Sequence, residues 1–418
     1  MPWVLFAFGL LCAVAAAISL RPPRWPGTVA LLVWPVGWLV GELPLHNFAI
    51  WSATGAALVI AGGLGDWPGY LGLAGLALGL VGLRQHLVHA AAAEDAVDRG
   101  LCQLDRCAPS GHRYTWRDYA TVFPFRPRAI HRVRDVEYAS VNGRSLRLDV
   151  LGPAGPASSA GDAATRRPVF VYVHGGGWVI GHKNQQGRLT VHELVAAGWV
   201  CVSINYRLSP RATWPDHIVD VKRALAWVKR NIAAHGGDPD FIVIGGGSAG
   251  AHLASLTALS AHDKTFQPGF ADDDLSVQGC VAYYGIYDFV DRDRHFPYRA
   301  FQTFLLRHIV MKARLERARE LYDRASPVAH ISPAAPPFLV WHGDRDSLAP
   351  VAGARAFVEK LRARATAPCV YVELPGAQHA FELFPSLRSV AAVKGTHRFC
   401  QAIWSAHRAR VLTPADRS

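Results

Sequence analysis

The sequence predicts an α/β protein, a doubly wound and mostly parallel eight-stranded sheet flanked by helices, behind an apolar helical region. Two observations predict this. Residues 1–83 hold four apolar stretches and only four charged side chains. After residue 130, short apolar runs without alternation are separated by helical patterns, as in a buried parallel sheet. We therefore expect a membrane-anchoring region at 1–83, a linker or cap segment at 84–130, and an α/β domain at 131–410 with a cap insertion at about 286–327.

Composition narrows the class of protein. Half of the 418 residues are hydrophobic and 18% are charged, which excludes a disordered or collagen-like chain. The net charge of +12 lies entirely on residues 84–418, because the four charges before them cancel. This excess is consistent with attraction to anionic lipid headgroups, or with a solvated surface in an arginine-rich chain. No basic block with interleaved aromatics occurs, so nucleic acid is not an expected partner.

The apolar region is expected to cross a membrane. A crossing helix needs about 20 apolar residues; the first and third stretches come close, and the other two are short. We expect two to four spanning helices; a soluble helical cap is the alternative, disfavoured by so few charges. Arg21 and Arg24 favour a cytoplasmic first loop, but the side on which the remainder lies depends on the number of spans. The four stretches are 3–20, 28–40, 48–64 and 69–83.

The α/β domain should begin with a hairpin, because Asn142-Gly143 is the preferred dipeptide of a tight turn between two strands. This hairpin would form an antiparallel edge of the sheet. The strands are expected at 133–140, 144–151, 169–173, 200–206, 241–244, 277–284, 338–341 and 370–374. The clearest helices are expected at 216–234, 249–260, 351–365 and 387–408, and the mixed segment before the sheet is expected to be helical at 90–101.

The seven cysteines are too few for a disulfide scaffold. Cys102 and Cys107 are either free thiols or a local disulfide in an oxidising compartment. No cysteine and histidine spacing typical of zinc is present, so no metal site is expected.

A candidate nucleophile lies where one strand is expected to end and a helix to begin. Ser248 is the serine of a G-x-S-x-G pattern in this strand–turn–helix context, which a nucleophile elbow requires. The segment His174-Gly-Gly-Gly closes another strand upstream. The N–H groups of Gly175, Gly176 and Ala249 could form an oxyanion hole; a flexible glycine turn is the alternative for this segment.

A serine hydroxyl needs a general base, and the base needs an acid that orients it. His379 follows the last expected strand, where the base should lie, and the order serine, acid, histidine is the expected one. Two aspartates follow the preceding strand. Asp346 is the preferred acid, Asp344 could be a turn residue, and Glu382 is an outside candidate.

With these motifs in place, residues 130–408 resemble the hormone-sensitive-lipase-type carboxylesterases of the α/β-hydrolase superfamily. The apolar region in front resembles a membrane-associated bacterial subgroup of these esterases. The resemblance implies Ser248, Asp346 and His379 as a catalytic triad, with Gly175, Gly176 and Ala249 as oxyanion donors. The matching segments are HGGGW at 174–178, NYRLSP at 205–210, GGSAGAH at 246–252, HGDRD at 342–346 and QHAF at 378–381.

The sequence departs from the family at two positions. Many members carry aspartate where this chain has Gly247 and Asn205. Trp178 and the GSAGAH pattern also resemble prenylcysteine methylesterases and kynurenine formamidases, so Trp178 is a candidate substrate-binding residue and the substrate stays open.

The expected function is hydrolysis of short- to medium-chain or lipid-derived carboxylic esters through an acyl-enzyme, which requires no metal or organic cofactor. An amidase, a formamidase or a prenylcysteine-methylesterase-like hydrolase are alternatives within the same mechanism. A membrane scaffold with a hydrolase fold is the non-enzymatic alternative. We expect a multi-pass protein of the bacterial cell membrane that contacts lipids and an ester substrate. Residues 289–322 are expected to form a cap insertion over the active site and, with residues 84–130, to set acyl-chain preference. The aromatic side chains of this insertion are either part of the substrate pocket or ordinary core of the cap. The sequence gives no indication of the oligomeric state.

Overall fold

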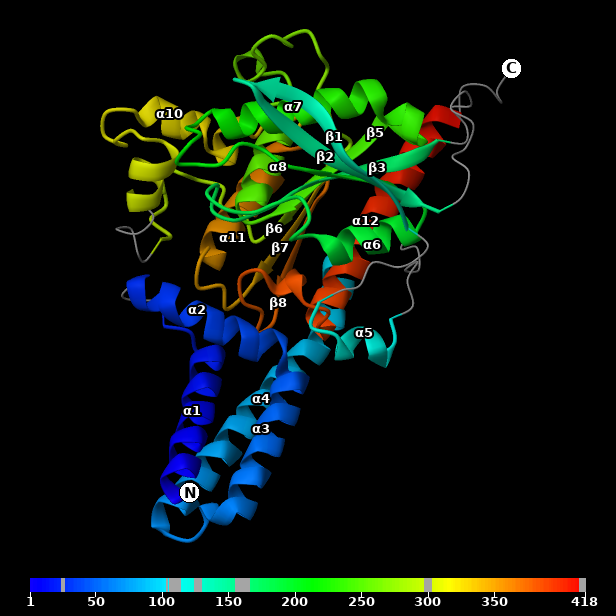
Figure 1. Ribbon diagram of the computed structural model, residues 1–418. Coiled ribbons are helices and arrows are strands. Elements are labelled where there is room, and N and C mark those ends of the chain that lie inside the picture. The colour runs from blue at the N-terminus through cyan, green and yellow to red at the C-terminus, as the bar shows by residue number, and fades with distance from the viewer. Residues whose placement is uncertain are drawn as a thin grey trace.

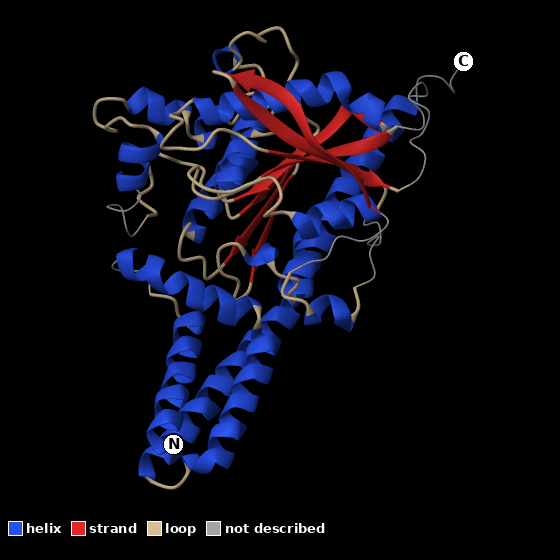
Figure 2. Cartoon of the chain, viewed as in Figure 1, coloured by secondary structure: helices blue, strands red, loops and turns tan. Residues whose placement is uncertain are grey.

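The structure is a computed structural model that describes residues 1–23, 27–102, 104, 114–123, 130–154, 166–296 and 303–412. Figures 1 and 2 show two parts: a bundle of helices at the N-terminus, and an α/β domain stacked on one end of it.

A single eight-stranded sheet forms the centre of the described α/β domain, in the order β1-β2-β4-β3-β5-β6-β7-β8. β2 pairs antiparallel with both β1 and β4, and every other pair is parallel. The expected sheet is therefore confirmed, including its antiparallel edge. The strands are β1 Ile130–Val141, β2 Arg144–Pro153, β3 Arg167–Val173, β4 Val200–Ile204, β5 Gly237–Gly247, β6 Gly279–Tyr283, β7 Phe338–Gly343 and β8 Cys369–Leu374.

The hairpin at the edge follows from its turn residues. Asn142 and Gly143 both have positive φ, 51° and 72°, as a tight turn between twisted antiparallel strands requires. Val141 consequently pairs with Arg144, the first residue of β2.

Helices cover both faces of the sheet. On one face, α7, α8 and α11 pack through buried side chains such as Ile218, Leu253 and Phe357. On the other, α6, α12 and the end of α4 do so through Leu194, Phe399 and Val97. The helices of this domain are α6 Arg188–Ala196, α7 Asp216–Asn231, α8 Ala249–Leu259, α10 Arg319–Arg324, α11 Val351–Arg364 and α12 Leu387–Leu412.

The four apolar stretches all form helices, but they are not equivalent. Of the described helices, α1, α3 with its π-helical continuation η1, and α4 are long and apolar enough to cross a membrane, whereas α2 is shorter. The N-terminal helices are α1 Pro2–Leu20, α2 Gly27–Glu42, α3 Pro44–Leu58, η1 Val59–Gly63 and α4 Trp67–Leu101.

Helices α1 and α4 pack backbone to backbone at glycines. A Cβ on Gly72 would lie 2.4 Å from the backbone of Leu5, and a Cβ on Gly9 would lie 1.8 Å from the carbonyl oxygen of Gly72. Small residues at such crossings allow close approach where lipid offers no hydrophobic driving force.

The expected boundary at residue 83 falls inside α4, which is one continuous helix to Leu101. Residues 84–101 contain no proline and include a run of alanines, so nothing interrupts the helix there. Its end packs on the sheet, where a Cβ on Gly100 would lie 2.5 Å from Val372 Cγ2. The first part of the expected linker, residues 84–101, is therefore the C-terminal part of α4, the longest helix of the N-terminal bundle. Its other described part holds the short helix α5, Trp116–Ala120.

Of the two neighbouring cysteines, Cys102 and Cys107, the structure describes only the first. Cys102 is a free, exposed thiol at the end of α4. Cys107 lies outside the described residues.

Candidate active site

Ser248 occupies the turn between β5 and α8. Its backbone has φ 55° and ψ −120°, a strained conformation for a residue with a side chain. Its neighbours must be small: a Cβ on Gly246 or Gly250 would lie 2.4 or 2.0 Å from the carbonyl oxygen of Val173. The elbow is therefore formed as its sequence predicts, with the serine at the start of a helix.

His379 and Asp346 come together with Ser248 although they are far apart in the chain. His379 Nε2 lies 2.9 Å from Ser248 Oγ, and His379 Nδ1 lies 2.7 Å from Asp346 Oδ2. All three residues follow strands of the sheet: β5, β7 and β8.

The carboxylate of Asp346 is buried and held on several sides. Its Oδ1 accepts hydrogen bonds from the backbone N–H groups of Leu348 and Ala349, at 2.9 and 2.7 Å. Burial alone would raise the pKa of Asp346, but the nearby His379 and hydrogen bonds from His342 and His379 hold it well below its usual range. An ionised Asp346 keeps the proton of His379 on Nδ1, which leaves Nε2 free to accept the hydrogen of Ser248.

The other two candidate acids, Asp344 and Glu382, are not bonded to His379. Asp344 Oδ1 accepts a hydrogen bond from the Gly376 N–H at 2.7 Å, which ties together the loops after β7 and β8. Glu382 is buried and accepts hydrogen bonds from the hydroxyls of Tyr284 and Tyr172. Both ring nitrogens of His379 are already taken by Ser248 and Asp346.

The expected oxyanion donors fall into two groups. The Gly175 N–H donates to Gln186 Oε1 at 2.6 Å, so this donor is already paired with a side chain. The N–H groups of Gly176 and Ala249 have no hydrogen-bond partner within the described residues. Gly176 also lines the cavity described next.

A cavity of about 470 Å³ opens beside Ser248 and His379, with walls that are almost entirely apolar. Trp178 lines it, although this side chain is buried, with its indole Nε1 donating to His252 Nδ1 at 3.2 Å. Such a space suits an apolar group of a substrate. Its apolar lining comprises Leu31, Trp34, Trp178, Val179, Ile180, Ile286, Phe296, Leu305, Leu306, Ile309, Leu348, Ala349, Ala380 and Leu383.

Comparison with known proteins agrees with this geometry. A family model described as BD-FAE matches residues 159–361. The chain is 40% identical to the probable carboxylic ester hydrolase LipM of Mycobacterium tuberculosis, across 96% of this chain and 94% of LipM. The chain belongs to the hormone-sensitive-lipase-type carboxylesterases of the α/β-hydrolase superfamily. It is a carboxylic ester hydrolase.

Two further relatives and one solved structure are also similar to this carboxylesterase. Esterase LipQ of the same organism is 47% identical over 57% of this chain and 56% of LipQ. A probable isoprenylcysteine alpha-carbonyl methylesterase of Oryza sativa subsp. japonica is 32% identical over 52% of this chain and 50% of its own length. The truncated form of a carbohydrate esterase from gut microbiota has the same fold, with a TM-score of 0.57 and 22% identity over 66% of this chain and 96% of that one.

The carboxylesterase's departure at Asn205 has a structural role. Its Oδ1 accepts a hydrogen bond from the Lys183 N–H at 2.7 Å, and the next residue, Tyr206, donates its hydroxyl hydrogen to the carbonyl oxygen of His174 at 2.9 Å. This pair therefore supports the two ends of the glycine loop. At the second departure, a Cβ on Gly247 would lie 2.6 Å from Tyr284 Oη, so a side chain has no room there.

The segments that line the cavity differ from those the sequence predicts. Residues 84–130 are expected to help form the substrate site, but none of their described residues lines the cavity. Leu31 and Trp34 of α2 line it instead, together with residues of the expected insertion: Leu305, Leu306 and Ile309. The reason is that α4 carries residues 84–101 away to β8 and α12, while α2 runs beneath the catalytic loops (Figure 1).

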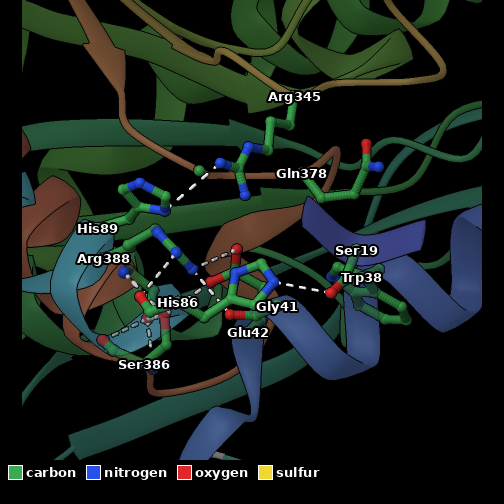
Figure 3. Close-up of polar contacts among 12 residues, drawn as sticks. Ser19, Trp38, Gly41, Glu42, His86, His89, Arg345, Gln378, Ser386 and Arg388 are labelled. Carbon is green, nitrogen blue, oxygen red and sulfur yellow. Dashed lines mark hydrogen bonds and ion pairs between the residues drawn. The ribbon is translucent and has the colours of Figure 1, made fainter. Parts of the chain in front are cut away.

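A buried polar cluster joins the N-terminal helices to the catalytic domain (Figure 3). We call it the junction cluster; it comprises Gly41, Glu42, His86, Ser386 and Arg388. The Arg388 guanidinium donates to the carbonyl oxygens of Gly41, His86 and Pro375, at 2.8, 3.1 and 2.9 Å. It also lies 3.3 Å from Glu42 Oε1, and Ser386 Oγ donates to Glu42 Oε2 at 3.0 Å. Both charges are fully buried, so each depends on the other.

Two glutamines near the site hold its loops in place, although the sequence analysis predicts no role for them. Gln378 Oε1 accepts hydrogen bonds from the N–H groups of Ser347 and His379, at 2.7 and 2.9 Å, and so joins the loop after β7 to the loop after β8. Gln186 holds the glycine loop through Gly175. Only the place of Gln378 beside His379 could have indicated the first, and no motif marks the second. Among the described residues, no group of histidine, cysteine or acidic side chains could hold a metal ion.

Proposed function

We propose that this carboxylesterase is a membrane-anchored serine hydrolase of lipid-derived esters, with Ser248 as nucleophile, His379 as general base and Asp346 as the acid that orients it. The observation that carries the proposal is the continuous hydrogen-bonded chain from Ser248 Oγ through both nitrogens of His379 to the ionised Asp346. A hydroxyl in this arrangement is activated by an adjacent base in the correct tautomer.

The reaction follows from these groups. Ser248 Oγ attacks the ester carbonyl carbon while its proton passes to His379 Nε2, and the carbonyl oxygen becomes an oxyanion. The N–H groups of Gly176 and Ala249 donate to that oxyanion, because both are free of other partners in the described structure. His379 then protonates the leaving alcohol, which departs and leaves the acyl group on Ser248. Water, deprotonated by His379, hydrolyses this acyl-enzyme and restores Ser248.

Gly175 takes a supporting role in this proposal. Its N–H is bonded to Gln186, and the carbonyl oxygen of Gly175 lies 2.8 Å from His174 Nδ1. These two contacts fix the loop that presents Gly176. Trp178 is proposed as part of the wall against which the substrate packs, since its ring lines the cavity and is held by His252 and Phe289.

Membrane anchoring rests on α1, α3 with η1, and α4. The 19 residues of α1 extend over about 28 Å, close to the hydrocarbon thickness of a bilayer. With these three crossings and α2 remaining at the surface, the α1–α2 connection and the catalytic domain lie on the same side. Arg21 in that connection favours the cytoplasmic side, so we propose that the catalytic domain faces the cytoplasm.

A second candidate substrate is the methyl ester of a prenylated cysteine. The similarity to a probable isoprenylcysteine alpha-carbonyl methylesterase favours it, and the apolar cavity could receive a prenyl chain. Hydrolysis of S-farnesylcysteine methyl ester, compared with glycerol esters, separates the two substrates.

The experiment that tests the proposed function uses the full chain purified in detergent and p-nitrophenyl esters from acetyl to palmitoyl. We expect hydrolysis by the wild type and by S140A, which removes an exposed serine hydroxyl on β1 outside the cavity lining. S248A should lose activity by a factor of roughly 10⁴ or more. Hydrolysis by S248A at the wild-type rate would overturn the assignment of the nucleophile.

A further inference from the structure

Helix α2 lies between the apolar bundle and the catalytic domain. Figures 1 and 2 show it crossing the ends of α1 and α3 that face the sheet. Its 16 residues are too few for a crossing and include one charged residue, Glu42, at the C-terminal end. Apolar side chains at Val29, Val36 and Leu39 are exposed by 39, 38 and 42%. With three other helices long enough to cross, α2 lies between them and the catalytic domain, so its exposed apolar side chains would face the bilayer surface.

The same helix forms part of the catalytic cavity. Leu31 and Trp34 line the cavity that also contains Ser248 and His379. Trp34 stacks on Trp38 with ring centroids 5.1 Å apart. Trp38 in turn packs on Phe384 and donates its indole hydrogen to the carbonyl oxygen of Ala380, at 3.0 Å. The helix is thus fastened to the loop of the catalytic base, with one face in the cavity.

The rest of the cavity lining is also apolar, and part of it is exposed. Ile180 lines the cavity and is 68% exposed. Leu305 and Ile309 lie on η5, Leu305–Val310, and also line the cavity. Phe304, just before η5, is 55% exposed. An exposed apolar rim is costly in water and typical of a surface that contacts lipid.

We propose that α2 is the lipid-side wall of the substrate route: the acyl chain of an ester held in the bilayer passes α2 to reach Ser248, and Leu31 and Trp34 determine which chain lengths are accepted. This inference rests on the proposed function, because it assigns the substrate class of that same site. The substrate is an ester with a long acyl chain in the membrane, and the carbonyl carbon reaches Ser248 while the chain remains against apolar side chains.

The test compares two neighbouring positions on α2 in the full chain reconstituted into phospholipid nanodiscs. L31W fills the cavity wall, whereas L32W places the same ring on a side chain that is 76% exposed and outside the cavity lining. The measured quantity is kcat/KM for p-nitrophenyl palmitate divided by kcat/KM for p-nitrophenyl acetate. The acetate rate in the same preparation corrects for the fraction of folded enzyme.

We expect this ratio to fall by about tenfold or more in L31W, a size typical of a blocked apolar subsite, and to stay within about twofold of wild type in L32W. L31E, which puts a charge in the route, should lower the ratio at least as far. An unchanged ratio in an active L31W, or an equal fall in L32W, would overturn the role of α2 and leave the catalytic proposal standing. A wild type that hydrolyses neither ester would overturn the proposed function, and this inference with it.

Discussion

The indole Nε1 of Trp38 donates a hydrogen bond, 3.0 Å long, to the carbonyl oxygen of Ala380, the residue that follows His379. Trp38 belongs to the N-terminal helices, whereas His379 belongs to the catalytic domain. Ala380 has a positive φ of 62°, an uncommon conformation that a fixed partner helps to maintain. The N-terminal helices therefore contact the loop of His379, the proposed general base, directly.

Asp346→Asn should lower kcat by about 10⁴-fold, because an amide in place of the ionised carboxylate no longer holds the proton of His379 on Nδ1. The matched control is D344N, the same substitution two residues earlier. Its amide oxygen can still accept the hydrogen bond from Gly376, so kcat should stay within about tenfold of wild type. Steady-state hydrolysis of a short-chain ester measures both, and a larger loss in D344N would contradict the assignment of the acid.

Glu382→Gln tests the third carboxylate. The glutamine oxygen can still accept a hydrogen bond from one of the two hydroxyls, Tyr284 or Tyr172, and the amide NH2 group can donate to the other hydroxyl oxygen. The Glu382 side chain is bonded to neither nitrogen of His379, which face Ser248 and Asp346. We expect kcat to fall by less than about tenfold, far less than in D346N. Equal losses in E382Q and D346N would show that Glu382 takes part in catalysis.

The same variant should change the pH dependence of stability. Burial raises the pKa of Glu382 above its ordinary value, so the folded protein binds this proton more tightly than the unfolded chain does. That contribution is present below the unfolded pKa and is lost as the pH rises through the folded pKa. The Tm of E382Q minus the Tm of wild type should therefore increase between about pH 5 and pH 8. A difference that stays constant or decreases would contradict this sign.

The junction cluster should be sensitive to the loss of one partner. Glu42→Ala leaves the buried Arg388 guanidinium without its carboxylate, and removing one member of a buried pair costs about 3–5 kcal/mol. We expect a lower Tm of the detergent-solubilised protein. The double variant E42A/R388M should recover part of that loss, because no buried charge is then left uncompensated. A Tm for E42A equal to that of wild type would show that the pair contributes nothing to stability.

Topology is predicted by the number of crossings. With three spans, a C-terminal fluorescent-protein fusion should fluoresce and a C-terminal alkaline-phosphatase fusion should be inactive in a bacterial host, because both report a cytoplasmic C-terminus. An active phosphatase fusion would place the catalytic domain outside the cytoplasm and would contradict the proposed orientation.

The sheet and the residues around Ser248 were predictable because their signals are local. The strands are short apolar runs between helices, the Asn142-Gly143 turn requires two positive φ values, and glycines beside Ser248 fit a turn with no room for side chains. The order of Ser248, Asp346 and His379 along the chain, each after a strand, was enough to indicate that they meet.

The features of the fold and of the site that the sequence does not predict depend on contacts between distant segments. Nothing in residues 27–42 indicates that Leu31 and Trp34 line a cavity with His379, or that Gly41 and Glu42 bind Arg388. The change from apolar to polar composition at residue 83 suggests a domain boundary there. Helix α4 continues through it, because apolar and polar residues can both occupy a helix. The bond from Gly175 to Gln186 likewise depends on how one loop folds back on another.

Covalent labelling tests most directly whether Ser248 is the nucleophile. The detergent-purified full chain is treated with a fluorophosphonate, digested, and the modified peptide is identified by mass spectrometry. We expect a label on Ser248 that rises in step with the loss of ester hydrolysis, and no label at this site in S248A. Modification of a different residue in step with inactivation, or continued hydrolysis after Ser248 is fully labelled, would contradict it.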